Sequence, residues 1–367
     1  MKLFICGDIF KKSEKKLWIS KEMHQVIKSS DYSFCNLEGP LIKSYFKPIV
    51  KAGPLLAQDK TLLNDLSYYG FTHAAVANNH IFDYGNLGLK HTLNQLKKNK
   101  INYFGAGETY FEAYKIKILK KKNIKIGLFS VCENFDGCLT KIKKEDNPGY
   151  SWLFSSHLDE QIIKYQKKLN FIILFAHAGI EDLSFPIPEI RSRFKYLSKI
   201  GVDIIIGSHP HVPQGIEKIS NKVIFYSLGN FYFENQDSDI YKESFSVLIN
   251  FSSKKFNYNL VYHKTKNNKV NLCAKSDVNF NIVNLNKMLK KNFLKINKKT
   301  AVTLYDTYYK YFFKFYLDSF FGIKILIKRI IKNILYLNYF KNETSILHKH
   351  FEQVESHKFT IQRGKLF

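Results

Sequence analysis

Residue types that bind metal ions follow five of the short apolar runs in this sequence, at the point where each run ends. The five positions are Asp8, Glu38, Asn79, His177 and the triplet His209-Pro210-His211. In an open α/β sheet, ligands bind beside the carboxyl ends of the strands, because the loops converge there. Carboxylate and amide oxygens mixed with imidazoles suit Mn²⁺, Zn²⁺ or Fe²⁺. The pattern therefore predicts a metal centre, in which Glu38 could lie between two adjacent ions.

Each of these residues taken alone has an ordinary explanation. A single histidine after a strand more often makes a loop hydrogen bond than a metal bond, and a carboxylate in that place is often a helix N-cap. The coincidence of suitable ligands at five strand ends is what favours a metal centre. Cys6 and Cys35 lie close before Asp8 and Glu38, and they fit small core residues better than ligands.

The elements that would position these residues alternate between apolar runs and amphipathic stretches up to about residue 230. The predicted strands are residues 3–6, 32–35, 72–77, 124–132, 171–176, 202–206 and 223–228. The predicted helices lie near residues 14–28, 59–69, 86–99, 156–168 and 189–200. Strands that alternate with helices predict an α/β layer architecture. Consecutive strands at 223–231, 244–251 and 257–263 are expected to extend a sheet in antiparallel fashion.

Composition describes a folded protein with a large positive charge. Of the 367 residues, 45% are hydrophobic and 24% charged, and the formal net charge is +26. Only four of the basic residues are arginines, which argues against a specific nucleic-acid reader, because such proteins use arginine to contact guanine. The five cysteines form no C-x-x-C pair, which fits a reducing compartment. No signal peptide and no apolar span are recognisable, so a cytoplasmic location is expected.

The last quarter of the chain differs from the rest. Residues 281–367 hold 17 Lys+Arg against 5 Asp+Glu, and apolar residues recur there with a helical period. We therefore divide the chain into residues 1–280 and a basic helical domain at 281–367. Its helices are expected to pack their apolar face on the first domain. The alternative is that the basic amphipathic stretch at 310–340 lies on anionic lipid.

Several motifs, taken in order, resemble the CapA family of capsule and poly-γ-glutamate synthesis proteins, within the calcineurin-like metallophosphoesterase superfamily. The motifs are Gly7-Asp8, Asn36-Leu37-Glu38-Gly39-Pro40, Ala77-Asn78-Asn79-His80 with Asp83-Tyr84-Gly85, Gly207-Ser208-His209-Pro210-His211 and Tyr226-Ser227-Leu228-Gly229-Asn230-Phe231. The resemblance covers roughly residues 1–250. It implies a metallophosphoesterase-like four-layer α-β-β-α sandwich, here followed by the basic helical extension.

The resemblance also implies roles for individual residues. The implied metal ligands are Asp8 and His211 for a first ion, Asn79, His177 and His209 for a second, and Glu38 as the bridge. His80 would face the substrate as the acid for the leaving oxygen, with Asp83 orienting its imidazole. The residues placed near the substrate are Asn78, Glu181 and Asn230. The chain departs from the superfamily at Phe10, where a histidine is common, and at Glu38, where the bridge is usually aspartate.

These residues predict two divalent metal ions, with Mn, Fe or Zn as the candidates, that activate a water molecule for attack on a phosphoester. His80 with an ordinary imidazole pKa of about 6.5 could act as a general acid near neutral pH. The substrate is expected to be an anionic small molecule or polymer. The leading hypothesis is a hydrolase of capsule or surface polymer synthesis. The alternatives are a non-catalytic, membrane-associated assembly subunit, with peripheral contact through the basic C-terminal helices, and a general phosphodiesterase.

Overall fold

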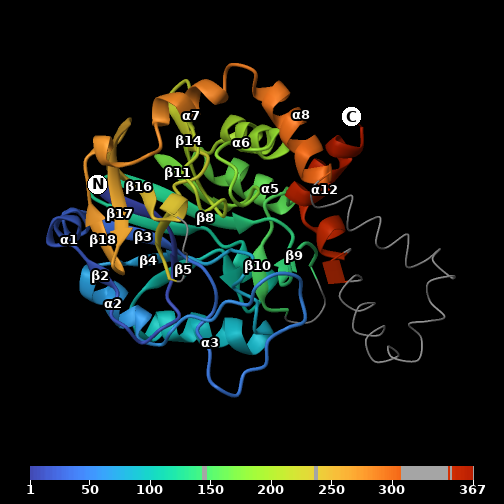
Figure 1. Cartoon of the computed structure of the whole chain (residues 1–367). Coiled ribbons are helices and arrows are strands. Elements are labelled where there is room, and N and C mark those ends of the chain that lie inside the picture. The colour runs from blue at the N-terminus through green and yellow to red at the C-terminus, as the bar shows by residue number, and fades with distance from the viewer. Residues whose placement is uncertain (143–146, 235–238, 307–345, 348, 367) are drawn as a thin grey trace, which may run out of the picture.

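The computed structural model describes residues 1–142, 147–234, 239–306, 346–347 and 349–366, and its described strands form two large sheets and one small one (Figure 1). The first sheet has the order β2 (Trp18–Ile19), β18 (Lys269–Leu272), β17 (Phe256–Lys266), β16 (Glu243–Phe251), β1 (Lys2–Phe10), β3 (Tyr32–Leu37), β4 (His73–Ala75) and β5 (Asn102–Phe104), with β15 (Asn230–Phe233) also paired to β1. The second sheet has the order β13 (Ile216–Ile219), β14 (Lys222–Phe225), β12 (Ile204–Ser208), β11 (Phe171–His177), β8 (Ile124–Cys132) and β7 (Lys117–Lys121). The small sheet consists of β6 (Ala106–Gly107), β10 (Gly149–Ser151) and β9 (Cys138–Leu139).

Helices cover the outer faces of both large sheets. The helices against the first sheet are α1 (Lys21–Lys28), α2 (Leu62–Tyr69) and α3 (Gly85–Lys98). The helices against the second sheet are α5 (Ser156–Tyr165), α6 (Pro188–Ile200) and α8 (Phe293–Leu304). The remaining described helices are α4 (Tyr110–Ala113), η1 (Asp239–Tyr241), η2 (Lys275–Asp277), α7 (Ile282–Met288) and α12 (Glu355–Lys365).

Strand β1 shows how the sequence produces these layers. Successive side chains of a strand point to opposite faces. Leu3 and Ile5 accordingly lie in the apolar core between the two sheets, whereas Phe4 and Cys6 pack toward the helices on the outside. The predicted four-layer α-β-β-α sandwich is therefore confirmed.

Parallel pairing brings the carboxyl ends of the central strands to one edge of the sandwich. In the first sheet β1 pairs in parallel with β3, and Asp8 lies opposite Asn36. In the second sheet β11 pairs in parallel with β12, and His177 lies opposite Ser208. Because the two sheets pack against each other, both sets of strand ends open toward the same region.

Two predicted elements were wrong in their bounds. The helix predicted at 14–28 begins only at Lys21, because the hydroxyl of Ser20 caps it by accepting from the Met23 amide, and strand β2 precedes it. The strand predicted at 223–231 is two strands in different sheets: β14 pairs in parallel with β12, and β15 pairs in parallel with β1. The antiparallel pairing predicted for the next two strands is confirmed by β16 and β17.

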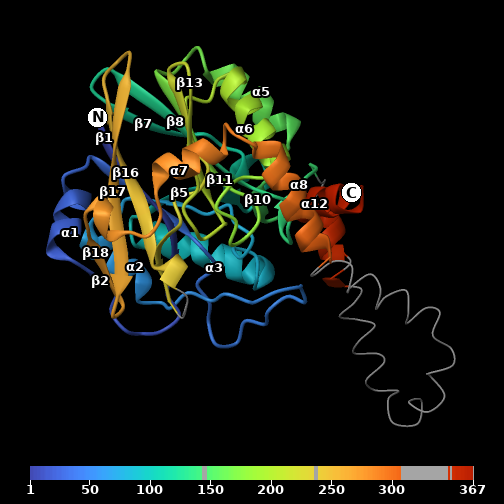
Figure 2. The same cartoon turned by 45° about the horizontal axis from the view of Figure 1, so that its top comes forward.

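The C-terminal part of the chain is described only in pieces. Helices α7 and α8 come after β18 in the chain. Helix α12 lies beside α8 in both views (Figures 1 and 2). The basic amphipathic stretch predicted at 310–340 lies outside the described residues. Among the residues that are described, none of the helices has the length and apolar character needed to span a bilayer.

Strand β1 lies so close to the segment between β14 and β15 that a side chain at Gly7 is predicted to destabilise the fold. A Cβ atom on Gly7 would lie 1.8 Å from the carbonyl oxygen of Gly229, so the backbone would have to separate. We expect Gly7→Ala to lower the free energy of unfolding by about 3 kcal/mol, measured by urea denaturation. Gly53→Ala is the control, since no atom lies within 4 Å and only its left-handed backbone, at φ +82°, opposes the change. Its expected loss is about 1 kcal/mol, and equal losses would contradict the packing argument.

Candidate metal centre

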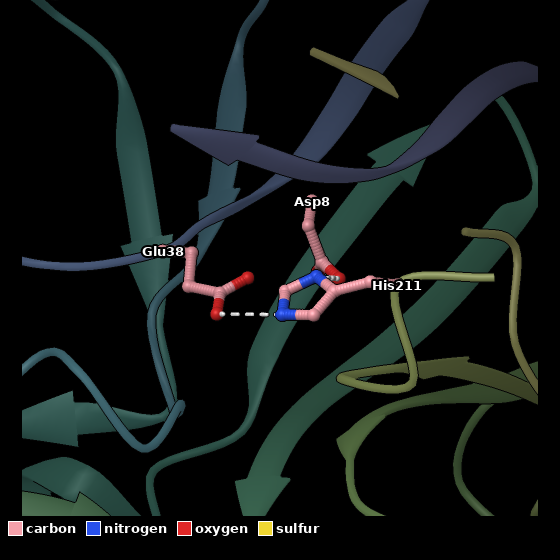
Figure 3. Close-up of side chains that lie close together, drawn as sticks. All are labelled: Asp8, Glu38 and His211. Carbon is pink, nitrogen blue, oxygen red and sulfur yellow. Dashed lines mark ion pairs between the residues drawn. The ribbon is translucent and has the colours of Figure 1, made fainter. Parts of the chain in front are cut away.

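Three of the predicted ligands meet where strands of both sheets end (Figure 3). Asp8 lies near the end of β1, Glu38 directly follows β3, and His211 lies in the loop after β12. One potential ligand atom from each residue lies within 4.8 Å of the others. The His211 Nδ1 atom is 3.6 Å from Asp8 Oδ2, and its Nε2 atom is 3.8 Å from Glu38 Oε1. Three protein donors with open positions are typical of catalytic metal sites.

The other predicted ligands lie close to the same carboxylate. His177 is the last residue of β11, and its Nε2 atom is 2.8 Å from Asn79 Oδ1 and 3.9 Å from Glu38 Oε1. The ring of His209 lies 4.8 Å from the ring of His177, measured between centres. All six predicted ligands are therefore brought together, and Glu38 lies near both groups.

Burial makes this cluster electrostatically unfavourable without a cation. Glu38 has no exposed surface, and among the described residues neither of its oxygens has a hydrogen-bond partner. Burial and the nearby charge of Asp8 raise the pKa of Glu38 well above its usual value, and burial also raises the pKa of Asp8. Burial lowers the pKa of His177 and of His209 well below that of free imidazole, so these rings are neutral. Buried carboxylates need a positive partner, which neutral imidazoles do not supply.

The donor set therefore fits divalent cations. Besides the unpartnered oxygens of Glu38, the Nδ1 atom of His209 is buried with no hydrogen-bond partner in the described part of the chain. Carboxylate, amide and imidazole donors together suit first-row transition metals. Cations placed among these atoms would satisfy each of them.

Side chains behind the cluster fix the orientation of the predicted ligands. Asn36 donates from Nδ2 to Asp8 Oδ1 at 2.7 Å and lies 3.2 Å from His177 Nδ1. The Oδ1 atom of Asn230, a predicted substrate-binding residue, lies 2.9 Å from His211 Nδ1 and leaves the Nε2 atom of His211 directed at Glu38. Such partners fix the tautomer and the ring orientation of metal-binding histidines.

The His209-Pro210-His211 segment also has an uncommon backbone. His209 has φ +94° and His211 has φ +61°, both in the left-handed region that residues with a side chain rarely adopt. Backbone strain of this kind persists where the surrounding structure enforces it, and it gathers at functional sites. Here the strained turn directs both imidazoles toward the cluster.

His80 and Asp83 lie beside the cluster as a hydrogen-bonded pair. The Nδ1 atom of His80 is 2.7 Å from Asp83 Oδ2, and its Nε2 atom is 4.0 Å from Glu38 Oε1. The ammonium group of Lys51 forms an ion pair with Asp83 and lies 3.2 Å from His80 Nδ1. Asp83 is thus placed to hold the imidazole with its Nε2 atom toward the predicted ligands.

The ordinary pKa predicted for His80 was wrong. Burial lowers the pKa of His80 to about 4, and the charge of Lys51 adds to this effect, while the hydrogen bond that His80 donates to Asp83 opposes it. The imidazole is therefore neutral at pH 7. Its short contact with a carboxylate oxygen indicates that Nδ1 carries the proton, which leaves Nε2 as an acceptor facing the cluster.

Two further predicted substrate-binding residues lie in different environments. Asn78 has no exposed surface, and its side-chain amide donates to the Leu37 carbonyl and accepts from the Gly39 amide. Its observed contacts hold the loops that follow β3 and β4. Glu181 is exposed in the loop after β11, and its charge contributes to the raised pKa of Glu38.

Phe10 belongs to an aromatic cluster beside His211. Its ring lies 5.0 Å from the ring of Phe233, which in turn lies 4.9 Å from the ring of His211. Phe10, at the position where the superfamily often has a further histidine, therefore supports His211 through the ring of Phe233.

A model of one protein family matches residues 2–235, which include every predicted site residue, and its description is bacterial capsule synthesis protein PGA_cap. The chain belongs to this family. Capsule biosynthesis protein CapA of Bacillus anthracis is 31% identical over 224 residues, which are 59% of this chain and 54% of that protein. PGA biosynthesis protein CapA of Bacillus subtilis (strain 168) is 31% identical over 220 residues, which are 59% of this chain and 57% of that protein.

The chain thus spans little more than half the length of these CapA relatives. Among solved structures, it is similar to the NAD nucleotidase of Haemophilus influenzae, with 13% identity and a TM-score of 0.42. That similarity covers 76% of this chain and 60% of the nucleotidase. The family match ends before β16, so the C-terminal helices lie outside it.

Reasoning from the sequence missed two residues of this candidate centre. Asn36 stands two positions before Glu38, and strand alternation puts both side chains on one face, so this contact had a local signal. Lys51 lies in the loop after β3, where no periodicity marks a residue that reaches His80.

The Glu38 carboxylate, which has no hydrogen-bond partner among the described residues, leads to a prediction about the unfolding temperature of Glu38→Gln with and without metal. Glu38→Gln removes an acid whose pKa is raised by burial, so folding no longer carries the cost of burying or protonating a carboxylate, and we expect the metal-free protein to unfold at a higher temperature than the wild type. The same change removes a ligand, so the rise in unfolding temperature that Mn²⁺ produces in the wild type should be lost. Differential scanning calorimetry with and without Mn²⁺ measures both effects.

Glu234→Gln is the matched control for this prediction. Glu234 is also buried, but its carboxylate accepts hydrogen bonds from the backbone amides of Lys12 and Ser13. The control should lower the unfolding temperature and keep the response to Mn²⁺. A Glu38→Gln protein that still responds to Mn²⁺ like the wild type would contradict the assignment of Glu38 as a ligand.

Proposed function

We propose that the protein is a metal-dependent hydrolase that cleaves a phosphoester, or a related bond, during synthesis of a capsule or other surface polymer. The observation that carries this proposal is the Glu38 carboxylate, which is buried without a hydrogen-bond donor from the described residues. Its Oε1 atom lies within 4.0 Å of ring nitrogens of three histidines, His80, His177 and His211. Membership of the family supports a role in capsule synthesis. The names of the two CapA relatives support a polysaccharide or poly-γ-glutamate as the polymer.

Two divalent cations, chosen from Mn, Fe and Zn, fit the donors of the centre. The residues that would hold them are Asp8 and His211 for the first ion, Asn79, His177 and His209 for the second, and Glu38 between the two. When bound, such a pair would lower the pKa of a water molecule and neutralise charge on phosphoryl oxygens.

His80 would act on the substrate. Asp83 holds its Nδ1 atom, so its Nε2 atom faces the centre. A phosphoryl group bound beside Nε2 would favour the protonated imidazole, because opposite charges attract, and Asp83 would stabilise the same form. The imidazolium would then donate a hydrogen bond to the leaving oxygen and transfer its proton as the ester bond breaks.

A non-catalytic assembly subunit is the competing function, and the His80 network argues against it. A purely structural metal site would need only the ligands. The ion pair of Lys51 with Asp83, and the orientation of His80 by Asp83, serve a side chain that is not a predicted ligand. A general phosphodiesterase would share the site and differ only in its substrate.

The first test of this function is metal content. We expect about two transition-metal ions per chain in protein purified with Mn²⁺, measured by mass spectrometry of the dissolved metal. His209→Ala should lose at least one of them, because the ring of His209 is a proposed ligand. His91→Ala, a partly buried histidine of α3 that packs on Phe46, should keep both. A wild-type protein that binds no metal after supply of Mn²⁺ would leave the assembly subunit as the better account.

The second test separates chemistry from metal binding. We expect the Mn²⁺-loaded protein to hydrolyse an aryl phosphodiester, and His80→Ala to lower kcat by about 10²- to 10⁴-fold, as is usual for loss of a general acid. The metal content of His80→Ala should equal that of the wild type, since His80 is not a proposed ligand. An unchanged kcat in this variant would exclude the proton transfer assigned to His80.

A further inference from the structure

The ammonium group of Lys51 lies at the centre of the contacts that surround His80. It forms an ion pair with Asp83, donates to the Asn79 carbonyl at 3.2 Å and lies 3.2 Å from His80 Nδ1. The side chains of Lys51 and Asp83 are only 7% and 1% exposed. One buried cation therefore contacts the proposed acid His80, its partner Asp83 and the backbone of the proposed ligand Asn79.

The loop that carries Lys51 is fastened to Asp83 on both sides of the lysine. The Ile49 amide donates to the backbone carbonyl of Asp83 at 2.9 Å, and the Leu56 amide donates to Asp83 Oδ2 at 2.7 Å. Lys51 contacts Oδ1 of the same carboxylate, and His80 Nδ1 lies 2.7 Å from its Oδ2 atom. Both oxygens of Asp83 thus have partners, and these partners fix the plane of the carboxylate.

The position of His80 matters because proton transfer depends steeply on distance. A general acid has to lie within hydrogen-bond reach of the leaving oxygen, and a misplacement of about 1 Å can cost 10²-fold in rate. The terminal torsion of an aspartate is soft, so Asp83 alone would not fix the imidazole. The ion pair with Lys51 holds one oxygen of Asp83 while the other stays on His80. The contact with the Asn79 carbonyl fixes the ammonium in turn, because it ties Lys51 to the residue next to His80.

We propose that Lys51 is a positioning residue: by holding Asp83 and the backbone of Asn79, it keeps the imidazole of His80 at the place from which it protonates the leaving oxygen. The proposal rests on the proposed function, since it needs His80 as the acid. In that step the proton moves from His80 Nε2 to the leaving oxygen as the bond to phosphorus breaks. The water molecule that replaces this oxygen supplies the hydroxide and, through solvent, the proton that His80 has lost. Lys51 acts through Asp83 and does not itself transfer the proton.

The test compares two methyl phosphodiesters whose leaving groups differ in their need for a proton. Phenoxide is basic and leaves with help from an acid, whereas 4-nitrophenoxide leaves as the anion. In the full chain at saturating Mn²⁺, we expect Lys51→Met to lower kcat for the phenyl ester by about 10²-fold and to affect the 4-nitrophenyl ester much less. His80→Ala should show the same selective loss. Adding Lys51→Met to His80→Ala should lower kcat no further, because the acid is already absent.

Metal binding and a second variant separate this role from a general disturbance of the fold. Lys51→Met should bind Mn²⁺ at least as tightly as the wild type in isothermal titration calorimetry, because no proposed ligand changes and a nearby positive charge is lost. Removing one partner of a buried ion pair destabilises a protein. Lys51→Gln is therefore the second variant, since its amide can still donate to Asp83. We expect it to fold and to show a smaller loss of kcat, again confined to the phenyl ester.

Lys11→Met is the matched control, because Lys11 is also fully buried and pairs with Asp65 of α2 at 2.8 Å. It should lower the unfolding temperature and keep kcat for both esters. Equal losses of kcat with both esters in the Lys51 variants, wild-type kcat with both, weaker Mn²⁺ binding, or a further loss on top of His80→Ala would overturn the positioning role and leave the hydrolase function standing. A metal-loaded wild type that hydrolyses neither ester would overturn the hydrolase function, and the role of Lys51 with it.

Discussion

The Glu38 carboxylate is removed from water and has no hydrogen-bond donor among the described residues, and this is the constraint that the rest of the structure has to satisfy. Burying an ionised carboxylate carries an effective penalty of several kcal/mol, which only a positive charge or several donors offset. Among the described residues no group donates a hydrogen bond to Glu38, Asp8 is a second acid, and burial keeps His177 neutral. The charge of Lys51 lowers the pKa of Glu38, but burial and the charge of Asp8 outweigh it. The sandwich meets this demand by bringing the strand ends of two sheets to one place. Pairing of β1 with β3 and of β11 with β12 sets Asp8 beside Asn36 and His177 beside Ser208. Cation ligands far apart in the sequence become neighbours in this way.

The parts of the fold that the sequence predicts are those with a local physical signal. Apolar runs that end in polar residues mark the strands β1, β3 and β11 and place Asp8, Glu38 and His177 at their ends. The division of residues 223–231 between two sheets has no such signal, because β14 and β15 are both apolar and the change occurs over a few residues near Gly229, at φ +77°. Lys51 could not be predicted either, since its contact with His80 depends on how a loop folds back in three dimensions. The pKa predicted for His80 was wrong for a related reason. Burial has the largest effect on this pKa, and burial depends on the assembled structure.

The two halves of the centre differ in how many protein donors surround them. His211 is backed by the rings of Phe233 and Phe10, so among the described residues the first half has three proposed donors, Asp8, Glu38 and His211. The second half has an amide and two imidazoles besides the shared carboxylate. A metal ion with fewer protein ligands keeps more positions for water or substrate. Because the side chain of Phe10 cannot bind a metal, its position would leave the first ion open on one side.

Residues 349–366, which we call the C-terminal segment, lie outside the region matched by the family model and contact a loop of the proposed metal centre. Glu133 accepts one hydrogen bond from the Gly179 amide in the loop of His177 and another from the Ser356 amide in the C-terminal segment. Because one buried carboxylate serves both segments, displacing the C-terminal segment would leave it short of a donor next to a proposed ligand loop, and a buried acid tolerates that poorly. Order in the metal centre and docking of the C-terminal segment are thus coupled through Glu133. Residues that lie beyond the region matched by the family model therefore contact the loops of the proposed metal centre.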